Sequence, residues 1–285
     1  MKPSWILLFT CPDAPGIQAF VSTFIHQKGG FIDDAIAHSD HETGQFSSRI
    51  VFRAADETPL DIEAFKSDLT KEAERFKMNW SVTSSGEKMP TVIAVSKFGH
   101  CLNDLLHRWK IGALPIDIRA IVSNHDTMRP MAEFYGLPFH HIPITKQTKM
   151  ESEAEFLRVV EQVGGELVVL ARYMQILSDG LSAKWSGRCI NIHHSFLPSF
   201  KGAKPYHQAY QRGVKLIGAT AHYVTTDLDE GPIIEQDVER VDHSQTPELL
   251  VEQGRDIEAR VLSRAVKWHA SRRVVMLGQR TIVLR

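Results

Sequence analysis

From residue 90 onward, short apolar segments alternate with amphipathic stretches that have helical spacing. This alternation predicts an α/β fold with a doubly wound, mostly parallel sheet, because parallel strands need crossover connections that cover both faces. Sites in such folds lie outside the carboxyl ends of the strands. The expected strands are Thr91–Ser96, Ile118–Ser123, Phe139–Ile144, Leu167–Ala171, Cys189–His193, Ala219–Thr225 and Pro232–Val238. The expected helices are Leu102–Trp109, Met128–Tyr135, Ser152–Val163, Leu181–Trp185 and a long one from Thr246 to about His269, before a hairpin at Val274–Leu284.

The first 85 residues follow another order, βαββαβ, which predicts a small antiparallel, ferredoxin-like sheet with helices on one face. A polar, glycine-containing segment, Ser84–Lys88, follows it and is typical of a linker. We therefore expect a domain at residues 1–85, a linker at residues 86–89 and a second domain at residues 90–285. The expected elements are strand Trp5–Thr10, helix 16–27, strands Phe31–His38 and Phe46–Arg53, helix Pro59–Phe76 and strand Asn79–Thr83.

Charge and cysteine content exclude several classes of protein. The 33 Lys and Arg residues nearly balance the 34 Asp and Glu residues, and the chain has no basic run, which disfavours a nucleic-acid partner. The first apolar stretch is too short for a secretory or membrane segment. Three widely spaced cysteines without a CxxC pattern suggest neither a disulfide framework nor a structural zinc site. A cytoplasmic protein without a membrane partner is expected.

The usual cofactor and hydrolase signatures are missing from the sequence. No GxGxxG follows the strand at Thr91–Ser96, and there is no GxxxxGK[ST], GxSxG or HExxH pattern. We therefore expect no cofactor. Adjacent histidines such as His140 and His141 point apart in a strand and lack ligand spacing, so no metal site is expected either.

Chemistry-bearing residues gather at the end of the strand Cys189–His193. Side chains alternate in a strand, so Asn191 and His193 should share one side while His194 points away. Asp229 lies in a turn between the next two strands, near the same edge. An amide, an imidazole and a carboxylate together can stabilise an oxyanion and move protons during attack on a carbonyl. The same residues could instead fix a loop and a turn, and His222 could either orient Asp229 or simply pack.

Three segments, Asn191–Pro198, Gly218–His222 and Leu228–Pro232, resemble the folate-dependent formyltransferase family. The resemblance implies that Asn191, His193 and Asp229 are catalytic, with His222 and Thr220 in support. The segments His100–Leu102, Leu170–Leu177 and Lys201–Tyr206 are similar to members of the family that use water as the acceptor. In the first domain, Cys11–Ile17 resembles the start of an ACT domain, a small-ligand sensing module.

The resemblance also implies a substrate and a mechanism. The substrate would be tetrahydrofolate that carries a formyl group on N10, and hydrolysis would give formate for one-carbon and purine metabolism. Asn191 and protonated His193 would donate to the oxyanion, and Asp229 would hold and help to deprotonate the water. The expected folate-binding residues are Tyr173, Met174, Gln175, Ile176, Leu177, Val224, Thr225 and Asp227.

Alternatives to hydrolysis remain open. The loop Ser96–His100 has a single glycine and the bulky Phe98, so a phosphate cradle for an acceptor is not expected there. Water is therefore favoured over a small amine acceptor such as glycinamide ribonucleotide. The other alternative is a catalytically inactive regulator that senses folate or an amino acid. The ACT-like domain implies a homo-oligomer, with glycine or methionine as a candidate effector near Asp13 and Gly16.

Overall fold

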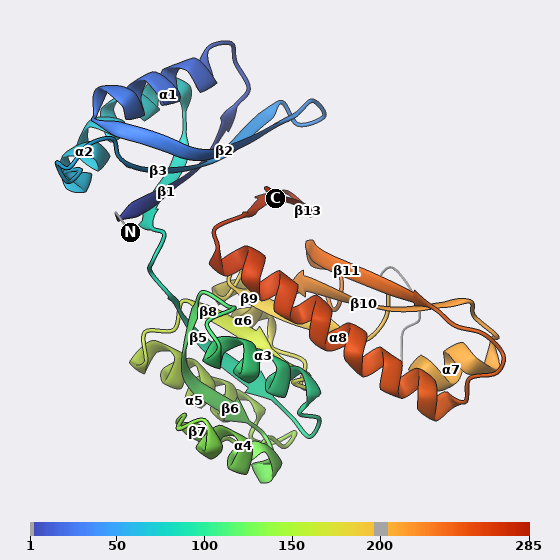
Figure 1. The fold of residues 1–285 in the computed structure, drawn as a ribbon. Coiled ribbons are helices and arrows are strands. Elements are labelled where there is room, and N and C mark those ends of the chain that lie inside the picture. The colour runs from blue at the N-terminus through green and yellow to red at the C-terminus, as the bar shows by residue number, and fades with distance from the viewer. Residues whose placement is uncertain (1–2, 197–204) are drawn as a thin grey trace. The chain divides into compact units, whose positions relative to one another are not determined.

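The computed structural model describes residues 3–196 and 205–285 (Figure 1). By its internal contacts the chain divides into two units. The first comprises Met1–Glu87 with Ser271–Leu277 and Ile282–Arg285, and the second comprises Lys88–Ala270 with Gly278–Thr281. The domain limits expected from the sequence placed all residues after 90 in the second unit, whereas these contacts group most of the last fifteen residues with the first.

The first unit has the βαββαβ order predicted from the sequence. Its sheet has the order β2-β3-β1-β4 and its paired strands are antiparallel. Both helices place apolar side chains such as Val21 and Phe65 on Leu7, Ile50 and Phe52 of the sheet. The elements are β1 (Ser4–Pro12), α1 (Ile17–Gln27), β2 (Gly30–Asp40), β3 (Gln45–Ala54), α2 (Ile62–Ala73), the 3₁₀ turn η1 (Glu74–Phe76) and β4 (Asn79–Ser84).

Helix α2 is shorter than the expected Pro59–Phe76. It begins where the Asp61 carboxylate accepts a hydrogen bond from the Ala64 amide, an N-cap that the pattern of apolar residues does not reveal. At the other end the last turn tightens to a 3₁₀ turn, and Lys77 takes a left-handed conformation with φ 52° that ends it.

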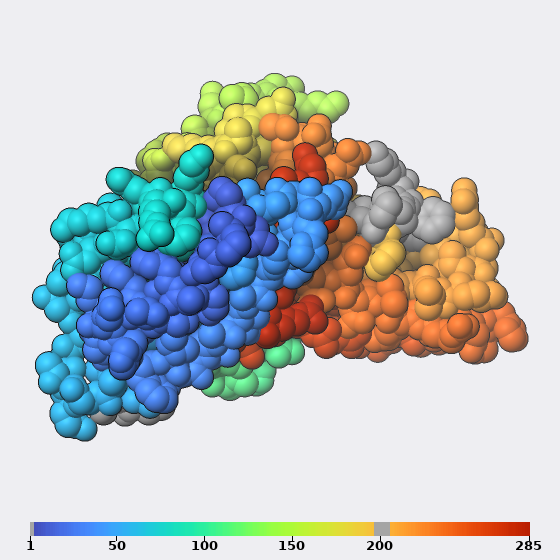
Figure 2. Space-filling view, turned by 90° about the horizontal axis from the view of Figure 1, so that it is seen from above, coloured from blue at the N-terminus to red at the C-terminus, as the bar shows by residue number. Residues whose placement is uncertain are grey.

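The C-terminal hairpin consists of β12 (Val274–Leu277) and β13 (Arg280–Val283), as predicted. Residues just before it contact the first sheet. Arg49 donates to the Ser271 carbonyl at 3.2 Å, and Arg273 lies 4.0 Å from the Asp34 carboxylate. In the space-filling view the red C-terminal residues accordingly lie beside blue residues of the first unit (Figure 2).

The second unit is the doubly wound α/β fold predicted from the sequence. Its sheet has the order β11-β10-β9-β8-β5-β6-β7. Strands β5–β9 pair in parallel, whereas β10 pairs antiparallel with both β9 and β11. The strands are β5 (Met89–Val95), β6 (Ile116–Ser123), β7 (Phe139–His141), β8 (Leu167–Leu170), β9 (Cys189–His193), β10 (Leu216–Tyr223) and β11 (Ile233–Arg240). Met89, expected in the linker, is thus the first residue of a strand. Strand β7 stops before Pro143, which has no amide hydrogen for the ladder.

Helices cover both faces of this sheet (Figure 1). Helix α5 places Phe156 and Val160 on Val92 and Val168 of one face, while α3 and α8 pack against each other and α8 against β9–β11. Thr246 accepts a hydrogen bond from the Leu249 amide, as the predicted N-cap requires. The helices are α3 (His100–Lys110), the 3₁₀ turn η2 (Asp126–Met128), α4 (Arg129–Phe134), α5 (Lys149–Gln162), α6 (Asp179–Lys184), α7 (Pro205–Gln211), which was not predicted, and α8 (Pro247–Ala270).

The strand order places a crevice at the carboxyl end of β5. From β5 the chain proceeds to β6 on one side and later returns to β8 on the other, so the loops after β5 and β8 leave in opposite directions. The loop after β5 carries Phe98 and leads into His100, the first residue of α3, and the segment after β8 carries Arg172–Leu177. Within the described residues, no helix is both long and apolar enough to cross a bilayer.

Candidate active site

Strands β9 and β10 bring four polar side chains to one side of the sheet. The antiparallel register pairs Asn191 with His222 and His193 with Thr220. Paired residues on neighbouring strands project to the same side, and so do residues two apart on one strand. The alternation argument for Asn191 and His193 therefore agrees with the structure.

Asp229 reaches these residues from the loop between β10 and β11. Its Oδ2 lies 3.2 Å from His193 Nδ1, and its Oδ1 lies 3.7 Å from His222 Nε2. The loop passes very close to β10, because a Cβ on Gly231 would lie 1.8 Å from the Tyr223 carbonyl oxygen. Asp229 itself has a φ of 58°, in the left-handed region that Asp tolerates better than most residues. A glycine and a left-handed aspartate thus position the carboxylate.

His222 and Thr220 hold this arrangement from β10. His222 is 2% exposed, and its Nδ1 lies 2.9 Å from the Tyr223 carbonyl, to which only a protonated Nδ1 can donate. Its Nε2 therefore faces Asn191 Nδ2, 3.2 Å away, and the Asp229 carboxylate. Thr220 is fully buried and donates to the Ser195 carbonyl at 2.9 Å, which fixes the chain just after β9.

The Asp229 carboxylate is held in its ionised form. Its burial opposes ionisation, but the contacts with His193 and His222 outweigh that effect and lower the pKa of Asp229 below its usual range. His193 Nδ1 is occupied by Asp229, whereas His193 Nε2 is buried and has no hydrogen-bond partner in the described part of the chain. One ring nitrogen is thus anchored and the other is available to a ligand.

The prediction that His194 points away from His193 is wrong. The two imidazole rings are stacked with centroids 5.0 Å apart and planes inclined by 22°, and both rings line one pocket. Strand β9 ends at His193, so the alternation of faces no longer holds at the next residue. Burial, followed by the charges of Arg172 and His193, lowers the pKa of His194 to about 4.

The pocket has a volume of about 760 Å³ and contains Asn191, His193, His222 and Asp229 in its wall. Two segments contribute to its wall: Tyr173–Leu177 after β8 and Val224–Asp229 after β10. All eight residues predicted to bind folate line it. Met174, Ile176 and Leu228 are 53%, 61% and 55% exposed, so the pocket offers apolar side chains to a flat ring.

A second polar cluster in the same pocket was not predicted from the sequence. Glu258 of α8, whose side chain is 1% exposed, lies 2.8 Å from His100 Nε2 and 3.3 Å from Arg172 Nε. The Tyr206 hydroxyl donates to its other oxygen at 2.8 Å. These residues come from four separate segments. His100, Arg172 and Tyr206 lie in segments that carry the family resemblance, whereas the only sequence signal for Glu258 was a charged residue in the apolar stripe of α8.

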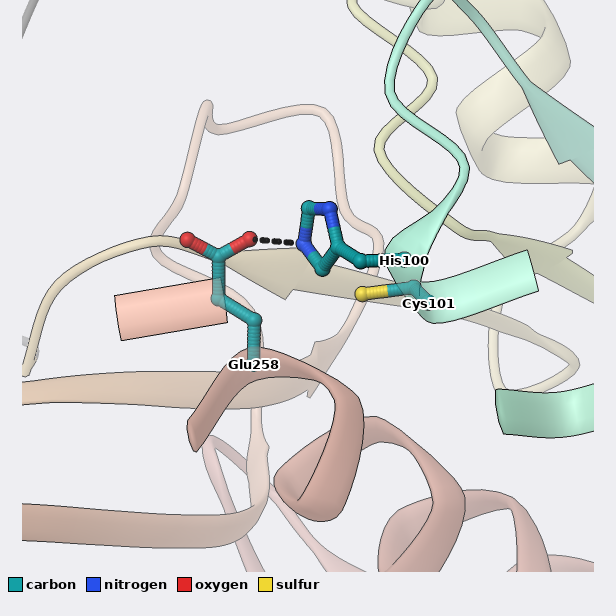
Figure 3. A group of neighbouring side chains, drawn as sticks. All are labelled: His100, Cys101 and Glu258. Atoms are coloured by element: carbon teal, nitrogen blue, oxygen red, sulfur yellow. Dashed lines mark hydrogen bonds and ion pairs between the residues drawn. The ribbon is translucent and has the colours of Figure 1, made fainter. Parts of the chain in front are cut away.

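Figure 3 shows His100 and Glu258 pointing toward each other, with Cys101 beside them. These three donor atoms lie within 4.8 Å of one another, a spacing that a metal ion could use. However, Glu258 already contacts Arg172 and Tyr206, and burial raises the pKa of the Cys101 thiol well above its usual value. A protonated thiol and a carboxylate beside a guanidinium make a poor ligand set. The group fits a hydrogen-bonded network better than a metal site.

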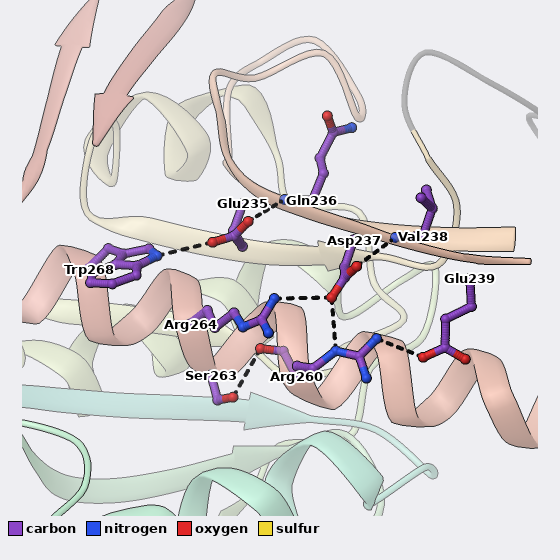
Figure 4. A network of polar contacts seen from close by, with 9 residues as sticks. All are labelled: Glu235, Gln236, Asp237, Val238, Glu239, Arg260, Ser263, Arg264 and Trp268. Carbon is purple, nitrogen blue, oxygen red and sulfur yellow. Dashed lines mark hydrogen bonds and ion pairs between the residues drawn. The ribbon is translucent and has the colours of Figure 1, made fainter. Parts of the chain in front are cut away.

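Helix α8 is fixed on its other side by β11. Arg260 contacts Asp237 at 2.9 Å and Glu239 at 2.8 Å, and Arg264 contacts Asp237 at 3.0 Å (Figure 4). Facing the pocket, a Cβ on Gly254 would lie 2.1 Å from the Tyr206 ring, so glycine makes room for that ring one turn before Glu258. The Glu258 carboxylate is therefore held in place from both sides of its helix.

Some predicted residues lie elsewhere. Gly16 is the N-cap of α1 with φ 91°, and the Asp13 carboxylate accepts a hydrogen bond from Ser39. Of the motif residues, Leu197, Pro198 and 201–204 lie outside the described residues, while Tyr206 contacts Glu258.

Comparison with known proteins identifies the family to which the chain belongs. Residues 89–266 match the formyl transferase family model. The chain is 50% identical over 280 residues to a formyltetrahydrofolate deformylase of Corynebacterium sp. strain P-1, with 98% of both chains covered. It is 47% identical to the Bacillus subtilis formyltetrahydrofolate deformylase, with 97% of this chain and 92% of that one covered. The crystal structure of formyltetrahydrofolate deformylase from Burkholderia mallei superposes with a TM-score of 0.95 at 51% identity, covering 99% of this chain and 100% of that chain.

Proposed function

We propose that this chain, which belongs to the formyltetrahydrofolate deformylase family, hydrolyses 10-formyltetrahydrofolate to formate and tetrahydrofolate. The observation that carries the proposal is the meeting of Asn191, His193 and Asp229 in one pocket. Hydrolysis of a formyl amide needs a donor for the oxyanion, a base for the water and a proton for the departing nitrogen. These three residues supply those groups.

Asn191 and His193 act on the carbonyl oxygen. Water attack on the formyl carbon produces a tetrahedral oxyanion, and donors aimed at that oxygen lower the barrier most. The buried His193 Nε2 donates when the ring is protonated, with Asp229 holding the other ring nitrogen. Asn191 supplies an amide hydrogen from the same side of β9.

Asp229 acts on the water. Its lowered pKa keeps the carboxylate ionised, so it can hold the water and accept a proton as the new carbon–oxygen bond forms. That proton then passes to N10 as the carbon–nitrogen bond breaks, which leaves tetrahydrofolate and formic acid. The acid releases its remaining proton to solvent and leaves as formate. His222 positions Asp229 and Asn191 together, and Thr220 fixes the segment after β9.

The folate ring lies between the two segments of the pocket wall. Tyr173, Met174, Gln175, Ile176 and Leu177 offer backbone and apolar groups from one side. The opposite side consists of Val224, Thr225 and Asp227, where the Thr225 hydroxyl donates to the Asp227 carbonyl at 3.0 Å and braces the loop. Exposed apolar side chains at Met174 and Ile176 support this placement.

The decisive assay incubates the purified protein with 10-formyltetrahydrofolate and no amine, and measures formate and tetrahydrofolate. Equal amounts of both products are expected, formed ~10²–10³-fold or more slowly by a matched His193→Ala sample. Activity that appears only with glycinamide ribonucleotide would make the protein a formyltransferase. Folate binding without turnover would make it a regulator.

For the first unit we propose a regulatory role, with glycine or methionine bound at the start of α1. Gly16 leaves the first amides of that helix open to a small carboxylate, whereas the Asp13 carboxylate is engaged by Ser39. We further propose a homo-oligomer, which sedimentation analysis of the full chain tests. Three buried free cysteines, Cys11, Cys101 and Cys189, support a cytoplasmic location.

A further inference from the structure

The folate-binding segment Tyr173–Leu177 has no regular secondary structure, although it contributes to the pocket wall. It lies between the end of β8 at Leu170 and the start of α6 at Asp179. A segment outside helices and sheets keeps one shape only when other groups satisfy its backbone amides and carbonyls. The residues that satisfy them therefore determine the shape that the segment presents to a ligand.

Ser96, the first residue after β5, holds the start of this segment. Its amide donates to the Arg172 carbonyl at 3.2 Å, and its Oγ accepts a hydrogen bond from the Met174 amide at 2.9 Å. The Ser96 hydroxyl donates its one proton to Asn124 Oδ1, 2.7 Å away. Ser96 and Asn124 are 2% and 8% exposed, so water does not compete for these bonds.

Glu153 of α5 holds the residue that follows the segment. Its Oε1 accepts a hydrogen bond from the Ser178 amide at 2.9 Å, and its side chain is 7% exposed. Ser178 is also the N-cap of α6 through its hydroxyl. One turn further along α5, the Phe156 ring packs edge-on against the buried Tyr173 ring, with centroids 5.7 Å apart. Helix α5 thus fixes both a backbone amide and an aromatic ring of this part of the chain.

We propose that Ser96 and Glu153 are positioning residues, which hold the folate-binding segment in the shape that receives the folate ring. The inference rests on the proposed function, because it concerns the same substrate and pocket. Gln175, Ile176 and Leu177 lie between the two anchored amides, and all three line the pocket. Neither Ser96 nor Glu153 is among the described residues that line it, so both act through the backbone of the segment.

Two anchors on one segment lower the entropic cost of binding. A segment that is already held in its bound shape loses less conformational freedom when the ligand arrives, so its affinity is higher. The groups proposed for the chemistry lie elsewhere, on β9 and in the loop after β10. Loss of an anchor should therefore weaken folate binding and leave the chemical step unchanged.

The test measures tetrahydrofolate binding to the full chain by calorimetry, together with KM and kcat for formate release. Ser96→Ala removes the Oγ that accepts from the Met174 amide. The dissociation constant of tetrahydrofolate and the KM should both rise ~3-fold to ~10-fold at an unchanged kcat, the scale of one lost hydrogen bond. Ser263→Ala, which removes a similarly buried hydroxyl from α8, should bind tetrahydrofolate as wild type does.

Glu153→Leu removes the acceptor of the Ser178 amide and should weaken tetrahydrofolate binding over the same range. Glu153→Gln keeps an oxygen for that amide, so it should recover most of the affinity that Glu153→Leu loses. Recovery in Glu153→Gln would show that the hydrogen bond, and not the negative charge, positions the segment.

A residue that serves folding alone would lower kcat, through a smaller active fraction, and leave the KM and the dissociation constant unchanged. That result in either variant overturns the positioning role of the residue concerned, and a wild type that does not bind tetrahydrofolate overturns the whole proposal. If Ser96→Ala or Glu153→Leu does not fold, the other variant decides alone. Calorimetry needs no turnover, so failure of the proposed hydrolysis is read separately, from formate release by wild type.

Discussion

The His194 imidazole stacks on the His193 imidazole, with ring centroids 5.0 Å apart and planes inclined by 22°. With a pKa lowered to about 4, first by burial and then by Arg172 and His193, His194 is neutral at pH 7. A neutral ring can pack on the proposed oxyanion donor without adding a second positive charge. His194 therefore belongs to the site, so a substitution of His194 is not a suitable control for a substitution of His193.

Replacing His194 should change how stability depends on pH. The pKa of His194 is about 4 in the folded protein against 6.5 for a free histidine, so between these values the unfolded chain binds the extra proton. The free energy of unfolding should fall as pH falls through this window, with up to one proton, about 1.4 kcal/mol per pH unit, coming from His194. Urea denaturation of His194→Gln from pH 7 to 4.5 should show a free energy of unfolding that depends less steeply on pH than in wild type. His107→Gln, a change at an exposed histidine, should show the same pH dependence as wild type. If the free energy of unfolding depended on pH in the same way in all three proteins, His194 would not be the group that takes up the proton on unfolding.

His193→Ala should lower kcat by ~10²–10³-fold or more, the scale of a lost oxyanion donor, with little change in folate binding. Steady-state formate release and equilibrium folate binding separate these two effects. His107→Ala is the matched control on an exposed surface. Turnover of His193→Ala near the wild-type value would show that another residue donates to the oxyanion.

Asp229→Asn should lower kcat by ~10²–10⁴-fold, because it keeps the side-chain shape but removes the base. Asn also tolerates the left-handed conformation with φ 58°, so the loop should persist. Thermal unfolding should therefore change far less than kcat. A variant that hydrolyses as fast as wild type would exclude Asp229 as the base.

Gly231→Ala should displace the Asp229 carboxylate indirectly, through the backbone of the loop. The new Cβ would lie 1.8 Å from the Tyr223 carbonyl oxygen, so the backbone must shift and carry Asp229 away from His193. We expect a loss of ~1–3 kcal/mol of stability, the usual range for overpacking, together with a lower kcat. Gly180→Ala, with open space around its Cβ, should be close to wild type in both measurements. Equal behaviour of the two variants would contradict the close approach of the loop.

Glycine or methionine should alter kcat/KM if the first unit senses them, since an effector must bind the active and inactive forms with different affinities. Asp13→Ala, which removes the contact with Ser39, should weaken the response, while the exposed Glu63→Ala should not. Deleting residues 1–85 is a less suitable test, because Ser271–Leu277 and Ile282–Arg285 group with that unit. If calorimetry showed no binding of glycine or methionine and kcat/KM were unchanged in their presence, the first unit would not be a sensor of these amino acids.

Local patterns in the sequence were enough for the order of strands and helices. Apolar periodicity is a property of neighbouring residues, so β9 was predicted at its observed limits, Cys189–His193. Side-chain alternation likewise placed Asn191 and His193 together. Element ends were less accurate, since the Asp61 cap of α2 and the stop of β7 before Pro143 depend on single hydrogen bonds that periodicity does not encode.

The sequence by itself therefore determined the two sheet types, the edge where the site forms and the three proposed catalytic residues. Only the tertiary structure decided the stacking of His194, since that residue lies just past the end of a strand, where no period applies. It also brought His100, Arg172, Tyr206 and Glu258 together. These four side chains come from a helix start, a left-handed residue after β8, a short helix and the middle of α8. Their meeting depends on how distant elements pack, which no local pattern of residues specifies.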